Sequence, residues 1–384
     1  MGNSKVWLSS PHIGNNELKY VNEAFATNWI APLGPHVNAF EEGLQNLTQT
    51  KHSAALSSGT SAIHLALILL GVKSGDIVFC QSITFSASAN PIAYQGAKPV
   101  FIDSEEDTWN MDPFLLRKAL EDADQNGKLP KAIIPVHLYG MPAKMNEIIA
   151  ISKEFNVPII EDAAEALGSN MNGKPCGSFG EFGVLSFNGN KIITTSGGGA
   201  LISNNAEMIQ KARFLSTQAR DSAPHYQHSQ IGYNYRMSNV LAGIGRGQLE
   251  VLNDRVIARR NNFERYKQFF SKLNKVGFNI QFQEEPDGYH SNRWLTCILV
   301  EPTTNKGLTR EEIRLELEVE NIEARPLWKP MHQQPVFALT KNYINGVSDQ
   351  LFENGLCLPS GSNLTEEEFD RIFNCLDTIF SKHI

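Results

Sequence analysis

The chain of 384 residues has few cysteines, no long apolar run and no excess of positive charge. Its five cysteines are scattered without metal-ligand spacing, which favours free thiols in a reducing compartment and no metal site. No apolar run approaches the ~20 residues of a membrane-spanning helix, and the first residues lack the apolar core of a signal peptide. A formal net charge of -7 disfavours nucleic-acid binding, because no basic face is available for a phosphate backbone. We therefore expect a cytoplasmic protein without a membrane or nucleic-acid partner.

Strand-like and helix-like segments alternate along the first two thirds of the chain. The residue pattern predicts strands at 53–56, 77–80, 99–102, 132–136, 158–161, 183–187 and 199–203, and helices at 61–70, 113–123 and 145–155. Strands separated by helices predict an α/β fold with a mixed, mostly parallel central sheet covered on both faces. In such sheets ligands gather at the carboxyl ends of the strands.

A continuous helical pattern at 238–273 leads into a C-terminal part with its own strands and helices. Strands are predicted there at 294–300 and 322–325, and helices at 310–318 and 366–380. This pattern predicts a large domain at 1–255 and a smaller α+β domain at 256–384.

Residues 57–61 (SSGTS) stand between a predicted strand and a predicted helix. The free N–H groups at a helix start, the hydroxyls and the positive end of the helix dipole suit a phosphate group. The same residues also suit an ordinary serine-rich helix cap. Both interpretations stay open for this segment taken alone.

Asp162 follows an apolar run at 157–160 and therefore lies at a strand end where ligands gather. A carboxylate at this place can hold a protonated pyridine nitrogen, which makes the ring an electron sink. It can equally cap a helix that follows the strand.

Lys191 ends the segment 186–191 (SFNGNK), just beyond another apolar strand. Its small and amide neighbours make it poorly placed for a surface salt bridge and well placed to form a Schiff base. A solvated loop lysine is the alternative. The order of a phosphate loop, an aspartate and then a lysine matches the layout of fold-type I enzymes that use pyridoxal phosphate (PLP).

Several short motifs extend this match over essentially the whole chain. The sequence resembles the DegT/DnrJ/EryC1/StrS sugar aminotransferases at residues 28–34 (NWIAPLG), 57–62, 84–87 (TFSA), 161–168, 186–191, 233–238 (YNYRMS) and 358–361 (LPSG). Within that family it is most similar to transaminases of bacillosamine-type pathways, which act on a UDP-linked 4-keto-6-deoxy-N-acetylglucosamine. The family usually carries Gly-Glu-Gly-Gly after its lysine, where this chain has SGGG at 196–199, so the role of that glutamate does not carry over.

The resemblance gives each matching residue a role. It implies that Lys191 forms the Schiff base, that Asp162 pairs with the pyridine nitrogen and that Glu165 contacts the ring hydroxyl. Phe85 would stack on the ring, unless it is an ordinary core aromatic. The implied phosphate ligands are Ser58, Gly59, Thr60 and Ser186, with Asn234 reaching in from a neighbouring subunit unless it belongs to a polar surface loop. A homodimer with shared active sites follows from these roles.

Two segments are candidates for binding the nucleotide sugar. One is the loop formed by Asn28, Trp29, Ile30 and Ala31, and the other is the segment formed by Arg325, Pro326, Leu327 and Trp328. Arg325 can oppose a diphosphate and Trp328 offers a flat apolar face, although Trp328 can equally pack the small domain. A structural role is favoured for both Trp294 and His332.

The resemblance implies a PLP-dependent transaminase of EC class 2.6.1 with ping-pong kinetics. L-glutamate would be the donor, and C4 of a UDP-linked 2-acetamido-4-keto-6-deoxy hexose would accept the amino group. The alternatives are a dTDP-linked keto-sugar aminated at C3 or C4, and a non-catalytic scaffold on the same fold. Lys191 argues against the related sugar dehydrases, in which histidine replaces the lysine. An NAD-dependent enzyme is disfavoured because the first strand–helix junction is serine-rich instead of a glycine fingerprint.

Overall fold

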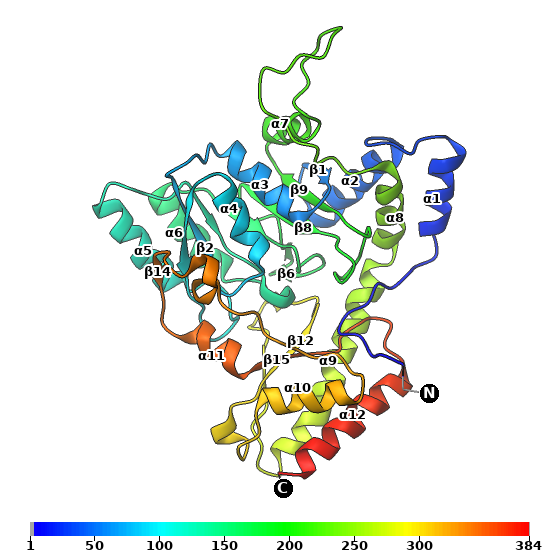
Figure 1. The fold of residues 1–384 in the computed structure, drawn as a ribbon, viewed down its shortest axis with the longest axis vertical. Coiled ribbons are helices and arrows are strands. Elements are labelled where there is room, and N and C mark those ends of the chain that lie inside the picture. The colour runs from blue at the N-terminus through cyan, green and yellow to red at the C-terminus, as the bar shows by residue number, and fades with distance from the viewer. Residues whose placement is uncertain (1–3, 384) are drawn as a thin grey trace.

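The predicted alternation of strands and helices is present in the computed structural model, which describes residues 4–383 (Figure 1). The strands of the first two thirds are β1 (His52–Leu56), β2 (Ile77–Gln81), β3 (Lys98–Ile102), β4 (Ala132–Ile134), β5 (Ile160–Asp162), β8 (Phe182–Ser186) and β9 (Gly199–Ser203). The helices between and after them are α3 (Gly59–Leu69), α4 (Asn90–Tyr94), α5 (Pro113–Gln125), α6 (Met145–Phe155) and α7 (Ala206–Ser216).

These strands form one twisted sheet. Two four-stranded sheets, of order β14-β3-β2-β4 and β1-β9-β8-β5, are joined by parallel bridges from Ile133 to Ile159 and from Val136 to Asp162. The pairs of the sheet are parallel except those that β9 makes with β1 and β8. The predicted mixed, mostly parallel α/β sheet is therefore confirmed.

Both faces of the sheet are buried, which explains why its strands are apolar runs. Side chains alternate between the faces along each strand, so Val78 and Cys80 pack with α3, α4 and α7. Phe79 and Ile133 point the other way and pack with α5 and α6. The helices thus cover the faces and leave the strand ends open for a site.

The predicted single helix at 238–273 is wrong as a continuous element. It divides into α8 (Asn239–Glu250) and α9 (Leu252–Asn274), with Val251 at φ -111° and ψ 7° between them. The break follows from close packing of α8 against α1 (Glu17–Ala26) and α2 (Pro35–Thr48). A Cβ at Gly247 would lie 2.6 Å from the backbone N of Glu17, so α8 packs tightly against α1 just before the break.

The C-terminal part has its own antiparallel sheet of order β10-β12-β15-β13. These strands are β10 (Gln281–Phe282), β12 (Thr296–Leu299), β13 (Arg325–Pro326) and β15 (Gly355–Leu358), and helices α9, α10 (Arg310–Val319) and α12 (Glu366–Ser381) pack on them. Two further C-terminal elements are α11 (Val347–Asn354) and β14 (Asn342–Tyr343), and β14 extends the edge of the large sheet beside β3. A small third sheet contains β6 (Asn170–Met171), β7 (Lys174–Pro175) and β11 (Tyr289–His290). A domain boundary after residue 255 would fall inside α9 and stays a prediction.

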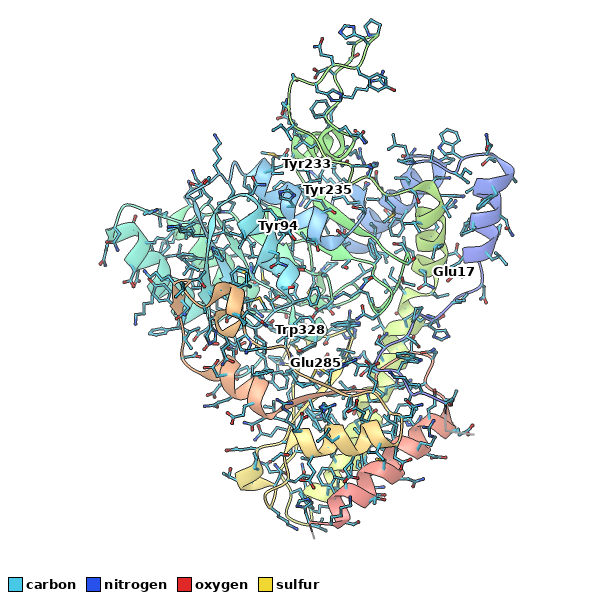
Figure 2. The ribbon with its side chains drawn as sticks, in the orientation of Figure 1. Glu17, Tyr94, Tyr233, Tyr235, Glu285 and Trp328 are labelled. Atoms are coloured by element: carbon cyan, nitrogen blue, oxygen red, sulfur yellow. The ribbon has the colours of Figure 1, made fainter. Side chains whose placement is uncertain are left out.

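Trp328 lies between the large sheet and the C-terminal sheet, near the middle of the molecule (Figure 2). The five cysteines are free. Within residues 4–383, no helix has both the length and the apolar character needed to cross a membrane.

Candidate active site

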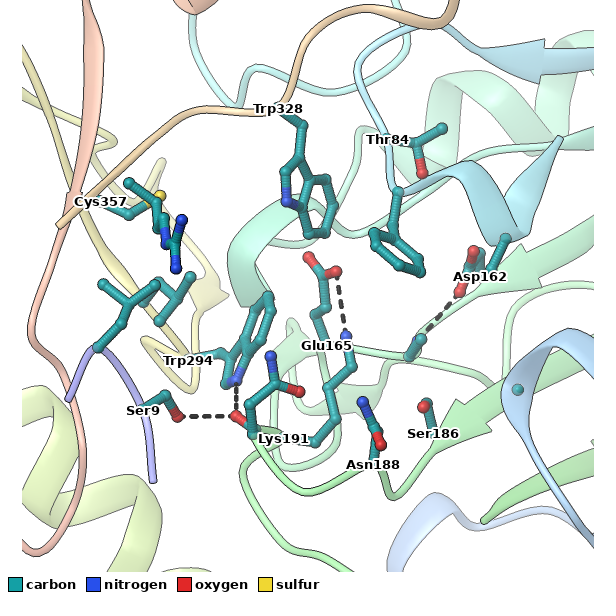
Figure 3. A pocket seen from close by; sticks show the side chains of 18 of the residues that line it. Ser9, Thr84, Asp162, Glu165, Ser186, Asn188, Lys191, Trp294, Trp328 and Cys357 are labelled. Atoms are coloured by element: carbon teal, nitrogen blue, oxygen red, sulfur yellow. Dashed lines mark hydrogen bonds and ion pairs between the residues drawn. The ribbon is translucent and has the colours of Figure 1, made fainter. Parts of the chain in front are cut away.

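The carboxyl ends of β1, β5 and β8 meet at one edge of the large sheet and face a cavity of about 820 Å³ (Figure 3). The β-sheet register brings Leu56 and Ser186 opposite the same residue, Gly199. Twelve of the residues singled out from the sequence line this cavity: Ser58, Gly59, Thr60, Phe85, Asp162, Glu165, Ser186, Lys191, Arg325, Pro326, Leu327 and Trp328. Residues far apart in the sequence are therefore brought to one place.

Segment 57–61 forms a helix cap and is also suited to a phosphate, so the two interpretations left open above are compatible. Ser58 is the N-cap of α3, and its hydroxyl accepts a hydrogen bond from the Ser61 N–H at 3.0 Å. The next two N–H groups, of Gly59 and Thr60, begin the helix and have no partner within it. A Cβ on Gly59 would lie 3.1 Å from the Cβ of Ser186, so the helix start and the end of β8 are in contact. The cap therefore forms one wall of a polar cradle suited to a phosphate.

Asp162 is the last residue of β5 and is 5% exposed. Its carboxylate accepts hydrogen bonds from the Ser88 hydroxyl at 2.6 Å and from the Ala164 N–H at 3.2 Å. Burial raises the pKa of Asp162, whereas the bond from Ser88 acts in the opposite direction. Turns follow β5 where a helix would have been capped, so the capping interpretation does not hold for this aspartate.

Lys191 is largely buried and points into the cavity. Its side chain is 11% exposed, and its Nζ lies 3.3 Å from Glu165 Oε1 and 4.1 Å from the ring centre of Trp294. Glu165 also accepts a hydrogen bond from the Tyr139 N–H at 2.7 Å. Burial raises the pKa of Glu165 to about 7, although the nearby Lys191 charge acts against this rise. The alternative of a solvated loop lysine is therefore wrong.

The backbone beside Lys191 is held from two sides. The Asn190 carbonyl accepts hydrogen bonds from the Ser9 hydroxyl and from the Trp294 indole N–H, both at 2.7 Å (Figure 3). Arg259 is fully buried and donates to Ser9 Oγ and to the Trp294 carbonyl. No local sequence pattern marks this anchor, because its members come from four separate segments.

Aromatic side chains line the cavity opposite the lysine. Phe85 is 56% exposed and its ring centre lies 5.6 Å from that of Trp328, so it is not a core aromatic. The Trp328 ring also packs on the Tyr139 ring, with centres 5.0 Å apart, and the backbone N–H of Trp328 donates to the Tyr139 hydroxyl. Trp294, for which a structural role was favoured, is buried and also lines the cavity.

Arg325 lies at the cavity mouth and its side chain is 65% exposed. Its guanidinium forms an ion pair with Glu323 at 2.8 Å. By contrast, His332 bridges Ser82 and Asp349, which agrees with the structural role favoured for it.

Two predicted groups do not line the cavity of their own chain. The loop with Asn28, Trp29, Ile30 and Ala31 is exposed, and Asn239 holds it by bonding the carbonyls of Trp29 and Ala31. Asn234 forms an isolated antiparallel β-bridge with Thr217. Its neighbours Tyr233 and Tyr235 stack on each other, and Figure 2 shows both rings near α7 and away from Trp328. A contribution to a cavity by these residues would have to come from another chain.

The sequence interpretation missed the N-terminal residues Trp7, Leu8 and Ser9, which also line the cavity. Their position depends on a bridge from Val6 to Ile322, and such a distant contact leaves no local pattern.

The cavity as a whole fits a ligand that carries a phosphate, a basic ring nitrogen and a carbonyl carbon, and PLP has these three groups. A helix start backed by Ser186 offers donors to the phosphate, Asp162 offers a buried carboxylate, and Lys191 offers an amine. The donor set is thus chemically suited to the cofactor.

Comparisons with known proteins agree with this geometry. The profile of the DegT/DnrJ/EryC1/StrS aminotransferase family matches residues 11–377. The chain is 55% identical over 380 residues to a Bacillus subtilis protein named "Putative pyridoxal phosphate-dependent aminotransferase EpsN", covering 98% of this chain and 96% of that one. It is 35% identical to a GDP-perosamine synthase of Caulobacter vibrioides over 98% of both chains. The PLP form of Spr1654 from Streptococcus pneumoniae superposes with a TM-score of 0.88 at 28% identity, covering 99% of this chain and 100% of that one. The chain therefore belongs to the DegT/DnrJ/EryC1/StrS family of sugar aminotransferases, which use PLP.

Proposed function

We propose that this enzyme transfers the amino group of L-glutamate to C4 of a UDP-linked 2-acetamido-4-keto-6-deoxy hexose. The observation that carries the transaminase chemistry is the meeting of Lys191, Asp162 and the start of α3 in one cavity. The choice of sugar and nucleotide is supported by the motifs NWIAPLG, EDAAEALGS and RPLWKPMH, which resemble the bacillosamine-type transaminases. The GDP-perosamine synthase at 35% identity makes a GDP-linked sugar the second candidate.

When bound, PLP supplies a carbonyl carbon with which amines condense and a ring that stores an electron pair. The N–H groups of Gly59 and Thr60 and the hydroxyl of Ser186 would hold its phosphate. Asp162 is well placed to keep a ring nitrogen protonated, because its carboxylate is buried and fixed by Ser88. Phe85, exposed at the cavity, would cover one face of the ring.

Lys191 would take a proton from the carbon of the donor and return it during amination of the sugar. Glu165 and Trp294 hold its Nζ in place on two sides. Since Trp294 is buried and its indole lies beside this amine, it also keeps bulk water away from one side of the transfer.

A homodimer in the cytoplasm completes the proposal. Trp29 and Ile30 are 47% and 54% exposed, although both are large and apolar, and they belong to the loop that the sequence suggested for substrate binding. Asn234 also lies outside the cavity of its own chain. Contact with the cavity of a second subunit would give both groups their implied roles. The five free thiols suit a reducing compartment.

The test is an incubation of the purified enzyme with PLP, glutamate and a panel of UDP-, dTDP- and GDP-linked 3-keto and 4-keto sugars. We expect amination at C4 of the UDP-linked sugar, with product mass and stereochemistry read by mass spectrometry and NMR. Lys191→Ala should lose turnover and the yellow absorbance of the bound cofactor. Lys118→Ala, a change of a lysine on the surface helix α5, is the matched control and should keep both. Turnover and absorbance that survive in Lys191→Ala would refute the role of Lys191, and preference for another sugar would refute the substrate.

A further inference from the structure

The N-terminal segment 5–9 forms part of the cavity mouth and is built firmly into the fold. The Val6 N–H donates to the Asn321 carbonyl at 3.0 Å, and the Glu323 N–H donates to the Val6 carbonyl at 2.8 Å. The Leu8 carbonyl accepts from the Ser360 N–H at 2.8 Å. A segment whose backbone is bonded on both sides of Trp7, at Val6 and Leu8, holds its side chains in fixed directions.

Trp7 is the unusual side chain of this segment. Val6, its neighbour, is fully buried in the C-terminal core, so in an extended chain Trp7 points to the opposite side. It lines the cavity and keeps 52% of its surface exposed. The ammonium of Lys5 lies 4.1 Å from the ring centre. A large indole held in place but left half open to a cavity is suited to stacking with a flat ligand group.

Positive charge gathers around the same mouth, although the chain as a whole is acidic. Arg325 and Lys329 line the cavity with Trp7, and Lys5 lies against the indole. Glu323 fixes this arrangement, because its Oε2 accepts from the Leu8 N–H at 3.1 Å and its Oε1 pairs with Arg325. The guanidinium is therefore held beside the segment that carries Trp7, with most of its surface free for an anion.

We propose that Trp7 is the platform on which the base of the nucleotide sugar stacks, with Arg325 binding the diphosphate next to it. The sugar would then extend along the cavity toward Lys191. This inference rests on the proposed function for its substrate class, a nucleotide sugar. Stacking accepts any base because each base has a flat face, so Trp7 would contribute affinity and not the choice of base.

The test measures uridine and UDP as competitive inhibitors of the PLP-bound enzyme. Trp7→Ala should weaken both inhibitors about tenfold, as expected for the loss of one base–aromatic stack. Trp7→Phe, which keeps a flat ring, should retain most of the affinity. Arg325→Gln should weaken UDP and leave uridine unchanged, since uridine carries no phosphate. Phe114→Ala, a change of a 73% exposed aromatic outside the cavity lining, should match the native enzyme.

A second readout separates binding from folding and from the proposed reaction. Conversion of the bound cofactor to its amine form by glutamate alone should run at the native rate in Trp7→Ala, because glutamate has no base. Native UDP affinity in Trp7→Ala, or an equal loss of the glutamate step, would overturn the platform. If native enzyme binds UDP through Trp7 but aminates no UDP-linked sugar, the proposed function fails while the platform stands. If native and Trp7→Ala enzyme both aminate a UDP-linked sugar with the same KM, the platform fails while the proposed function stands.

Discussion

Replacing Glu165 by glutamine should change how the stability of the cofactor-free protein depends on pH. Burial raises the pKa of the Glu165 carboxyl from 4.5 to about 7. Between these two values the folded state keeps a proton that the unfolded chain has lost, so the free energy of unfolding falls as pH rises through this window. The difference between 7 and 4.5, at about 1.4 kcal/mol for each pH unit, amounts to about 3 kcal/mol. Glutamine cannot ionise and should not show this fall.

The assay is urea unfolding of native protein and Glu165→Gln without cofactor, between pH 4 and pH 8. Subtracting the two curves removes the titrations of the groups that do not contact Glu165 and leaves those of Glu165 and its neighbours Lys191 and Asp162. The native protein should lose about 3 kcal/mol relative to the variant over this range. Glu154→Gln is the control: Arg117 holds the pKa of this exposed carboxylate below its ordinary value of 4.5, so its contribution is lost only as pH falls below 4.5. The curves of Glu154→Gln and native protein should therefore run parallel between pH 5 and pH 8. A difference between native and Glu165→Gln that stays constant with pH would refute the reasoning.

Three further changes test other parts of the site and core. Gly199→Ala would place a Cβ 2.3 Å from the backbone of Ser58, so the phosphate cradle must shift and PLP affinity, measured by absorbance titration, should fall more than tenfold. Ser9→Ala removes one of two donors to the Asn190 carbonyl, at a cost of about 1 kcal/mol, and should lower kcat about fivefold in steady-state assays without a change in KM for glutamate. Phe40→Ala empties a fully buried site packed on Phe187 and should cost about 3–5 kcal/mol of unfolding free energy, measured in urea.

The elements that carry the proposed cofactor site could be predicted because their signals are local. An apolar run followed by Asp162 marks a buried strand end, and SSGTS marks a helix start. Parallel strands then bring such ends to one edge without any further information. The apolar runs and helical patterns likewise predicted strands and helices whose bounds differ by only a few residues from those observed.

Features that depend on contacts distant in sequence could not be predicted. The break at Val251 follows from the pressing of Gly247 against Glu17, which a helical pattern alone does not reveal. β14 joins the edge of the large sheet from far along the chain, beside β3. Trp7 reaches the cavity through the pairing of Val6 with residues beyond 320. In each case the neighbour, and not the residue itself, decides the structure.

The position of Lys191 depends both on the local sequence and on contacts with residues far away in the chain. Its place beyond β8 can be read from the local sequence, but the loop that carries it begins at Phe187 and contains no helix or strand. Its backbone is held by Ser9 and Trp294, which donate hydrogen bonds to the preceding carbonyl from distant parts of the chain. Arg259 of α9 bonds both of these residues, so the helix that connects the two sheets also fixes the lysine. A change in the position of the N-terminal segment or of α9 should therefore alter the rate of the proton transfer that we propose for Lys191, even where every residue lining the cavity is kept.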